Sequence, residues 1–472
     1  MEFLKRKRAV ILTVAIGTFM SALDSSVVNM ALPTISSYFQ TTLATIEWTV
    51  MSYLLVISSL LLAYGRLGDM YGHKHIYLLG FIIFTIGSIL CGFAPTVILL
   101  IIFRSVQAVG AGMLMAVGPA IVTDTAPPDQ RGKALSITAI AVAVALTTGP
   151  VLGGLLTSAF GWQSIFLINI PIGIIGVWLA NKTVPESKER ILQPFDYIGA
   201  VLIFTALISI LVPLSLVERF GWNNPFLLAA IGFGLMLVSV FIFWEKRSPY
   251  PLFDLGLFKN RQFSMSNLAG LLNYMAQFTI ILLIPFYLQR LRGLPPAQAG
   301  FLYFPMPLTI MVLAPISGIL SDRMDTRYLS AAGMAVMAIG MWILSNLSIT
   351  SNNLFLIVGL VITGMGIGMF QTPNNSAIMG SVPRNRIGIA SGMLATMRNM
   401  GMVLGVAISG ALFSSSNHWF INFFQKKGLS GILLEQRAFI EALRITYTVG
   451  VVFALIAAGI SLAKGSRSNV AD

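Results

Sequence analysis

Two side chains that carry charge stand inside long apolar stretches of the sequence, Asp24 and Arg104. If both stretches are helices, Asp24 lies nine residues before Pro33 and Arg104 nine residues after Pro95, each about 14 Å from the end of its helix. Opposite charges at equal depth can pair, and an aspartate gains or loses a proton when a neighbouring guanidinium moves. We therefore predict that the two residues pair and handle a proton. A static pair that fixes two helices, and an acid held only by nearby hydroxyl groups, are the alternatives.

Other polar residues in apolar stretches could line a cavity. Asn29 follows Asp24 along one helical face. Arg398 is a further deep charge that could bond carbonyl groups or amide side chains, or meet an anionic part of a ligand. The residues that we predict to line a cavity for an organic compound are Asn29, Tyr53, Gln107, Asn273, Gln277 and Arg398.

The composition indicates that lipid is the main solvent of these stretches. The chain has 472 residues, of which 56% are hydrophobic and only 10% charged, and its mean hydropathy is +0.84. A soluble domain is roughly 25% charged. The net charge of +13 is spread over short loops, without a basic domain that could bind nucleic acid. With one cysteine and three histidines, no metal site or cofactor is expected.

The apolar stretches are about 20 residues long and continuous, which predicts membrane-spanning helices instead of a β-barrel. Hydropathy and the Gly, Pro and charge breaks predict fourteen, near 9–32, 47–65, 76–94, 96–120, 134–158, 164–181, 197–216, 226–244, 264–288, 298–320, 328–347, 354–379, 388–413 and 443–463. Loops on one side then hold 21 of the 30 Lys and Arg residues and those on the other hold 7, so both termini are expected in the cytoplasm. The longest external segment, 414–442, is predicted to carry an interfacial helix near 418–427.

Two sequence echoes indicate a parallel internal repeat. Gly65, Leu67 and Asp69 match residues 253 positions later, ending at Asp322, while Gly110, Gly112 and Pro119 match Gly364, Gly366 and Pro373 at an offset of 254. Such an offset is too long for six helices and suits eight. We predict an N-terminal six-helix bundle over 1–190, a two-helix insert over 191–255 and a C-terminal six-helix bundle over 256–472.

Four motifs resemble those of the major facilitator superfamily, in particular its fourteen-span drug:proton antiporter branch. They are Gly65-Arg-Leu-Gly-Asp69-Met-Tyr-Gly72, Gly149-Pro150-Val-Leu-Gly153-Gly154, Leu23-Asp24-Ser-Ser-Val-Val-Asn29 and Arg104-Ser-Val-Gln107. The chain departs from the family pattern at His73 and His75, where arginine is common, at Ala108, and at Glu47, which is commonly glutamine.

The resemblance implies roles for the first two motifs. Gly65, Asp69 and Gly72 would form a loop after the second helix that locks one conformation, with Asp69 bonded to loop N–H groups, a helix start or Arg131, and with Asp322 as a weaker counterpart. The alternative is a solvated turn. Gly149, Pro150, Gly153 and Gly154 would kink the fifth helix, allow close helix approach and favour export; plain packing is the alternative.

The resemblance further implies a proton-coupled exporter of amphiphilic or cationic drugs, associated with antibiotic resistance, in the cytoplasmic (inner) membrane. An exporter or flippase of an endogenous lipid or metabolite is the alternative. No phosphate-binding loop indicates ATP drive, and no nucleophile–base set indicates an enzyme. The expected partners are a small substrate, protons and the lipid bilayer, and the chain is expected to be monomeric.

Overall fold

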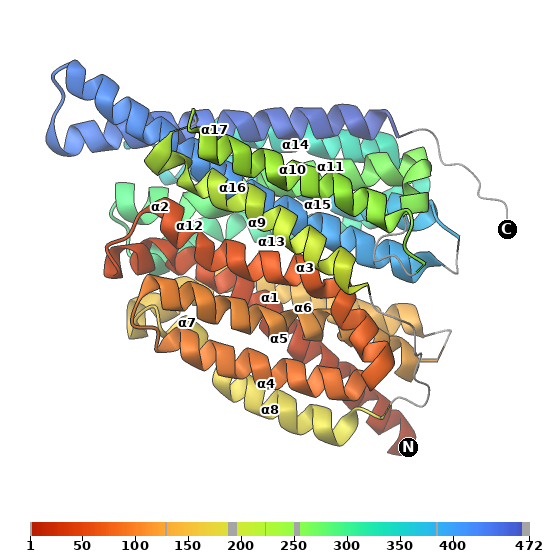
Figure 1. Cartoon of the computed structure of the whole chain (residues 1–472). Helices are drawn as coiled ribbons and strands as arrows, with labels where there is room; N and C mark the ends of the chain where they lie inside the picture. Colours follow the sequence, from red (N-terminus) through yellow and green to blue (C-terminus); the bar gives the residue numbers. More distant parts are fainter. Residues whose placement is uncertain are drawn as a thin grey trace.

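Helices make up nearly all of the computed structural model, which describes residues 2–127, 130–186, 196–221, 223–249, 255–383 and 386–464. Within these ranges there is no strand, and fourteen segments are long and apolar enough to cross a membrane. The all-α, fourteen-span prediction is confirmed. The helices run roughly along one common direction, and α1 begins at the end of the bundle where α17 finishes (Figure 1).

The first six spans pack on one another as an N-terminal half. A polar side chain caps the start of several helices; Thr96, for example, accepts the backbone N–H of Leu99. The helices of this half are α1 (Glu2–Tyr38), α2 (Leu43–Ile46), α3 (Trp48–Tyr71), α4 (His73–Gly92), α5 (Val97–Thr125), α6 (Arg131–Phe160), α7 (Ser164–Leu167) and α8 (Asn169–Thr183).

The last six spans form a C-terminal half in the same way. Its helices are η1 (Leu255–Lys259), α11 (Arg261–Phe286), η2 (Tyr287–Leu291), α12 (Pro296–Tyr303), α13 (Pro305–Arg323), α14 (Thr326–Ser345), α15 (Asn353–Gly380), α16 (Ile387–Lys426) and α17 (Gly431–Leu462). Of these, η2 is a π-helical turn.

Two further spans, α9 (Tyr197–Phe220) and α10 (Pro225–Glu245), pair with each other between the halves in sequence. In space α9 contacts both α3 of the N-terminal half and α16 of the C-terminal half. The indole N–H of Trp48 donates to the Ser215 hydroxyl across the contact with α3, at 2.9 Å. The insert therefore lies beside the seam, our name for the surface along which the two halves meet. The predicted domain boundary at 190/191 lies outside the described residues, and the division at 255/256 stays a prediction.

Close helix contacts at glycine show that the halves repeat the same packing. A side chain at Gly110 would overlap α4 at Gly80 and Phe84, and one at Gly366 would overlap α14 at Gly333 and Met337. Gly110 therefore corresponds to Gly366, an offset of 256. The predicted match of Gly110 with Gly364 is two residues out of register, because a Gly-X-Gly pattern can be aligned in two ways.

Two predicted loops are helical. Residues 65–71 form the last turns of α3, and only Gly72, with φ of 97°, separates α3 from α4. Segment 414–442 is not a loop either: α16 continues to Lys426 and α17 starts at Gly431, which gives a helical hairpin that projects from the bundle (Figure 1). The predicted interfacial helix is the end of α16. Rings four residues apart stack along it, Trp419 on Phe423 at 5.1 Å and Phe420 on Phe424 at 5.8 Å.

The seam is closed at one end, the end at which α1 and α6 finish, which we call the sealed end. Gln289 in the π-helical turn donates to the Met30 carbonyl at 2.6 Å and accepts from the Thr34 hydroxyl at 3.0 Å. The Ala297 N–H donates to the Ser158 hydroxyl at 3.0 Å. Towards the other end, no residue of α6 between 135 and 144 and none of α12–α13 between 308 and 316 is buried. The halves are therefore packed together only over part of their length.

Candidate functional site

Asp24 of α1 and Arg104 of α5 form a direct ion pair. The Arg104 Nη1 group lies 2.5 Å from Asp24 Oδ2, and each residue is only 1% exposed. The equal depth expected from Pro33 and Pro95 is what brings the two side chains together. Their role in proton transfer stays a prediction.

Three amide and hydroxyl side chains surround the carboxylate. Gln107 Nε2 donates to Asp24 Oδ1 at 2.9 Å, and Asn169 Nδ2 of α8 donates to the same oxygen at 3.1 Å. Both amide nitrogens also lie within 3.1 Å of the Ser88 hydroxyl of α4. The carboxylate is thus held by donors from two helices besides its own, α5 and α8, and Ser88 of α4 accepts bonds from both amide donors.

The guanidinium group is also fixed by several partners. Its Nε donates to the Thr49 carbonyl of α3 at 3.0 Å, and its Nη1 to Gln107 Oε1 at 2.7 Å. The ring of Tyr53 lies against it, with 4.1 Å from Arg104 Cζ to the ring centroid. A planar, always charged group with this set of contacts is well suited to keep its position when the aspartate changes its protonation state.

Sequence reasoning missed Asn169 and Ser88, and it did not link Tyr53 and Gln107 to the ion pair. The only sequence signal for Asn169 is a lone amide in an apolar run. Tyr53 and Gln107 were expected to line a substrate cavity, but they are 1% and 0% exposed and belong to the surroundings of the ion pair. Counting polar residues along a helix does not tell which neighbouring helix faces them, and a cavity role for Tyr53 and Gln107 stays a prediction.

The other cavity residues divide into two groups. Asn273 is also fully buried, and neither of its amide atoms has a hydrogen-bond partner among the described residues. Asn29, Gln277 and Arg398 are partly exposed. Asn29 donates to the Ser25 carbonyl one turn back at 2.9 Å.

Gln277 and Arg398 each have an identified neighbour in the C-terminal half, and the neighbour of Arg398 is a tyrosine and not the predicted carbonyl or amide group. Gln277 accepts a bond from Gln371 at 3.2 Å, so this amide pairs with another amide. Arg398 lies beside Tyr274, and its Nε has no hydrogen-bond partner among the described residues. Both side chains keep polar groups that could meet a ligand.

The glycines of the predicted antiporter motif serve two different contacts. Side chains at Gly149 and Gly153 would overlap Ser26 and Val27 of α1, within the N-terminal half. Gly154 instead faces Pro296 of the C-terminal half. The motif thus packs α6 tightly on its own half and leaves one glycine for the seam.

On the other side of the seam, Gly300 of α12 packs against α6 in the same way. A side chain at Gly300 would overlap the carbonyl group of Pro150, while one at Gly154 would overlap the carbonyl of Pro296. Gly300 was not singled out in the sequence, because its partner is distant in the chain. The two reciprocal contacts form part of the sealed end.

The segment around Asp69, which was predicted to lock one conformation, makes different contacts from those expected. His73 bridges Asp69 Oδ1, at 3.2 Å, and Asp124 Oδ2, at 3.1 Å. Arg131, proposed as a partner of Asp69, donates to the Thr123 carbonyl instead, at 3.1 Å. Position 73, where arginine is common in the family that the motifs resemble, is a histidine here, and this histidine binds Asp69.

Gly65 and Asp322, also predicted to help lock one conformation, make no close contact. A side chain at Gly65 would meet open space, and Asp322 is exposed and makes no side-chain hydrogen bond or ion pair within the part of the chain that the structure describes. Their proposed locking role stays a prediction for another conformation.

Lys464, directly after α17, is a buried base that the sequence did not reveal. It is 2% exposed, and its Nζ lies 2.5 Å from Asn374 Oδ1. Burial lowers the pKa of this lysine to about 7, although the nearby Asp325 carboxylate opposes the shift. The group therefore changes charge near neutral pH.

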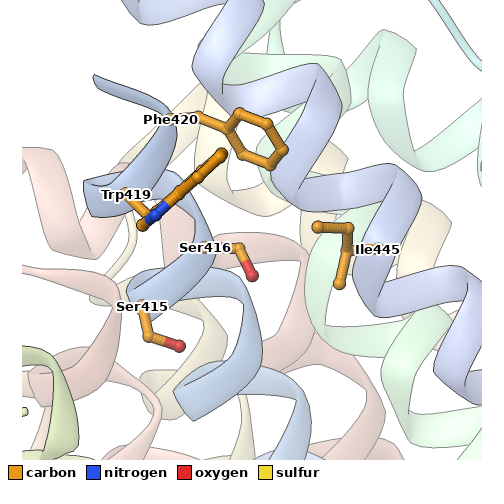
Figure 2. Close-up of a pocket in the computed structure, with 5 residues that line it drawn as sticks. All are labelled: Ser415, Ser416, Trp419, Phe420 and Ile445. Atoms are coloured by element: carbon orange, nitrogen blue, oxygen red, sulfur yellow. The ribbon is translucent and has the colours of Figure 1, made fainter. Parts of the chain in front are cut away.

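The helical hairpin carries a shallow pocket outside the bundle. Ser415, Ser416, Trp419 and Phe420 of α16 and Ile445 of α17 line it (Figure 2). None of the residues that line this pocket belongs to the ion pair or to its surroundings.

Comparison with known proteins assigns the chain to a family. The family model described as "Major Facilitator Superfamily" matches residues 14–196, 197–406 and 266–461. A riboflavin transporter, RibZ of Clostridioides difficile, is 39% identical over 414 residues, which cover 88% of this chain and 90% of that protein. Multidrug resistance protein 3 of Bacillus subtilis is 31% identical over 406 residues, 85% of this chain and 79% of that protein.

Solved structures share the architecture. A bacterial homolog of the human lysosomal transporter Spinster, in an inward-facing and unoccupied conformation, superposes with a TM-score of 0.70 at 17% identity, covering 97% of both chains. With the family match over most of the sequence and a fourteen-span helical fold, the chain is a multi-pass membrane transporter that belongs to the Major Facilitator Superfamily.

Proposed function

We propose that this transporter exchanges protons for an amphiphilic organic compound, and that it exports cationic or neutral drugs by alternating access. The observation that carries the proposal is the buried Asp24–Arg104 pair with its amide donors. An acid so enclosed in a membrane protein has a function in most cases, and proton binding is the reaction that its chemistry offers. Relatives named multidrug resistance proteins support the substrate class.

The geometry of the pair supports the following mechanism. Protonation of Asp24 removes its charge and with it the main attraction for Arg104, which keeps its bonds to Thr49 and Gln107. The packing of α1 against α5 then changes, and the two halves tilt about the seam. A seal at one end only is the arrangement that such tilting requires.

A second candidate is transport of a flat metabolite. The observation that favours it is the 39% identity with a riboflavin transporter, higher than that with the multidrug resistance proteins named above. The proton site would serve either substrate class.

We further propose that the protein lies in the cytoplasmic membrane with both termini in the cytoplasm, so that the sealed end faces outward. The excess of Lys and Arg in loops on the opposite side supports this orientation. Labelling of single introduced cysteines at exposed positions with a membrane-impermeant reagent in intact cells tests it.

The function is tested in proteoliposomes that enclose a pH-sensitive dye. A panel of cationic drugs, neutral drugs, riboflavin and phospholipid analogues is added, and proton movement and substrate movement are recorded together. We expect proton movement driven by one class, and its loss in Asp24→Asn with the protein still folded. Glu435→Gln, at an exposed acid that belongs to none of the predicted sites, is the matched control. Substrate movement by the wild-type protein without proton movement would contradict the proposal.

A further inference from the structure

Polar side chains from three helices of the C-terminal half meet inside the bundle. Gln371 Nε2 of α15 donates to Gln277 Oε1 of α11 at 3.2 Å, and Arg398 of α16 lies beside Tyr274, three residues before Gln277. Residues three apart on a helix are neighbours on its surface, so the amide pair and the guanidinium group are adjacent. All four side chains are partly exposed.

The amide pair keeps one donor and one acceptor unused. Apart from the bond between them, the side chains of Gln277 and Gln371 make no hydrogen bond within the described ranges of the chain, and neither the Gln277 nitrogen nor the Gln371 oxygen is fully buried. These two groups stay close together because the bonded atoms hold the amides in contact. An N–H donor next to a carbonyl acceptor is complementary to a ring amide, which offers a carbonyl and an N–H group of its own.

Arg398 adds a positive charge that no acid on the same three helices offsets. The sequences of α11, α15 and α16 contain neither Asp nor Glu. A guanidinium group repels a cationic compound and donates hydrogen bonds to carbonyl or other acceptor atoms. These surroundings therefore favour a neutral compound over a cation.

The group of side chains lies at a distance from the seal between the halves. Arg398 is 12 residues before Gly410, where α16 packs on α3 so closely that a side chain would overlap the carboxyl group of Glu47. Gln277 is 12 residues before Gln289, which bonds α1 across the seam. At 1.5 Å per residue each of these separations is about 18 Å. The polar groups are thus displaced from the sealed end towards the end where the halves are not packed together.

We infer that Gln277, Gln371 and Arg398 form a subsite for a neutral ring amide, such as a lactam or a cyclic imide. The ring carbonyl accepts from Gln277 Nε2, the ring N–H donates to Gln371 Oε1, and Arg398 donates to a second acceptor on the carbonyl side of the ring. The inference rests on the proposed function and specifies its substrate class, namely neutral planar compounds in preference to cations.

Binding to the purified protein in detergent, without a proton gradient, tests the amide pair. Riboflavin carries such an amide edge and its fluorescence reports binding, whereas 3-methylriboflavin lacks the N–H group. We expect the methyl group to weaken binding to the wild type by about tenfold, because the Gln371 oxygen then has no donor. In Gln371→Ala, which removes the acceptor and leaves room for the methyl group, the two compounds should bind within about twofold of each other.

The matched control is Gln425→Ala, at an exposed amide of the helical hairpin, which should keep the wild-type ratio of the two affinities. Thermal unfolding in the same detergent shows that each variant is folded. The charge is tested with tetraphenylphosphonium in equilibrium dialysis. This cation should bind Arg398→Gln about fivefold more tightly than the wild type, since the variant removes the repulsion, while riboflavin should bind that variant more weakly.

Three results would overturn the inference. They are an unchanged ratio of the two flavin affinities in Gln371→Ala, no binding of riboflavin to the folded wild type, and no gain in cation binding in Arg398→Gln. Failure of the proposed function is a separate result, namely the absence of substrate-driven proton movement in the vesicle assay, on which these binding measurements do not depend.

Discussion

Gly300 and Pro150 are in direct contact across the seam, with no room for a side chain between the glycine and the proline carbonyl group. Pro150 cannot donate a backbone hydrogen bond, so its place in α6 already loosens the helix. The missing side chain at Gly300 allows the two backbones to approach at the sealed end.

Gly300→Ala is expected to weaken the seal. Alanine is the better helix former, so a loss of activity would come from the overlap with Pro150. We expect transport to slow by about tenfold, which corresponds to roughly 1.4 kcal/mol. Transport in vesicles at equal amounts of protein measures it. Gly132→Ala, at a position of α6 with nothing within 4 Å, is the matched control, and equal rates for the two variants would refute the role of the contact.

Asn169→Ala should move the pH dependence of proton-coupled transport. The variant removes a donor to Asp24 Oδ1, and hydrogen bonds to charged groups contribute about 1.5–3 kcal/mol. Because the donor stabilises the ionised carboxylate, its loss should shift the pH midpoint of transport to higher pH, by about one unit. The midpoint is read from initial rates between pH 5 and 9, with the exposed Asn346→Ala as control. An unchanged midpoint would show that Asn169 is dispensable.

Tyr53→Leu and Tyr53→Phe separate two contacts of one ring. The ring faces the Arg104 guanidinium, a contact worth about 2 kcal/mol when removed from water, whereas the hydroxyl group makes only a 3.3 Å bond to the Ser21 carbonyl. Tyr53→Leu should therefore lower the thermal unfolding temperature in detergent more than Tyr53→Phe. Equal effects would assign the stabilisation to the hydroxyl group.

Lys464 predicts a pH dependence of stability with a defined sign. Its pKa is about 7 in the folded protein and 10.5 in an exposed lysine, so between these values the unfolded chain binds more protons than the folded one. The stability of the folded protein should consequently rise with pH from about 7 to about 10.5, and protonation below pH 7 should weaken the docking on Asn374. Thermal unfolding of the wild type and of Lys464→Met over this range checks it. A parallel pH profile in both proteins would contradict it.

Much of the fold could be predicted from the sequence because lipid imposes simple rules. Long apolar runs must be helices, and basic loops orient them. The Asp24–Arg104 pair was accessible for the same reason, since depth in a helix follows from counting residues to a proline. The bounds of the helices were less accessible: residues 65–71 and 414–426 are polar enough to suggest loops, yet they continue helices beyond the apolar core.

What could not be predicted depends on contacts between distant helices. Asn169 of α8 reaches Asp24, and Ser88 of α4 accepts a hydrogen bond from Asn169; no periodicity in either stretch points to them. Gln107 and Tyr53 have the composition of cavity residues, but their helices turn them towards the ion pair. Glu47 could be noticed as an acid, whereas the space at Gly410 that receives it exists only in three dimensions.

The uninterrupted course of α16 has a mechanical consequence at the helical hairpin. Its 40 residues extend over about 60 Å, and the ring contact between Phe413 and Phe439, with centroids 4.9 Å apart, couples it to α17. Because the hairpin is a direct continuation of α16 and α17, it turns as one body with the parts of these helices inside the bundle. A rotation of the C-terminal half by a few degrees would swing the exposed Trp419 through several ångströms, so the emission of a fluorophore attached at its tip would follow each transport cycle in real time.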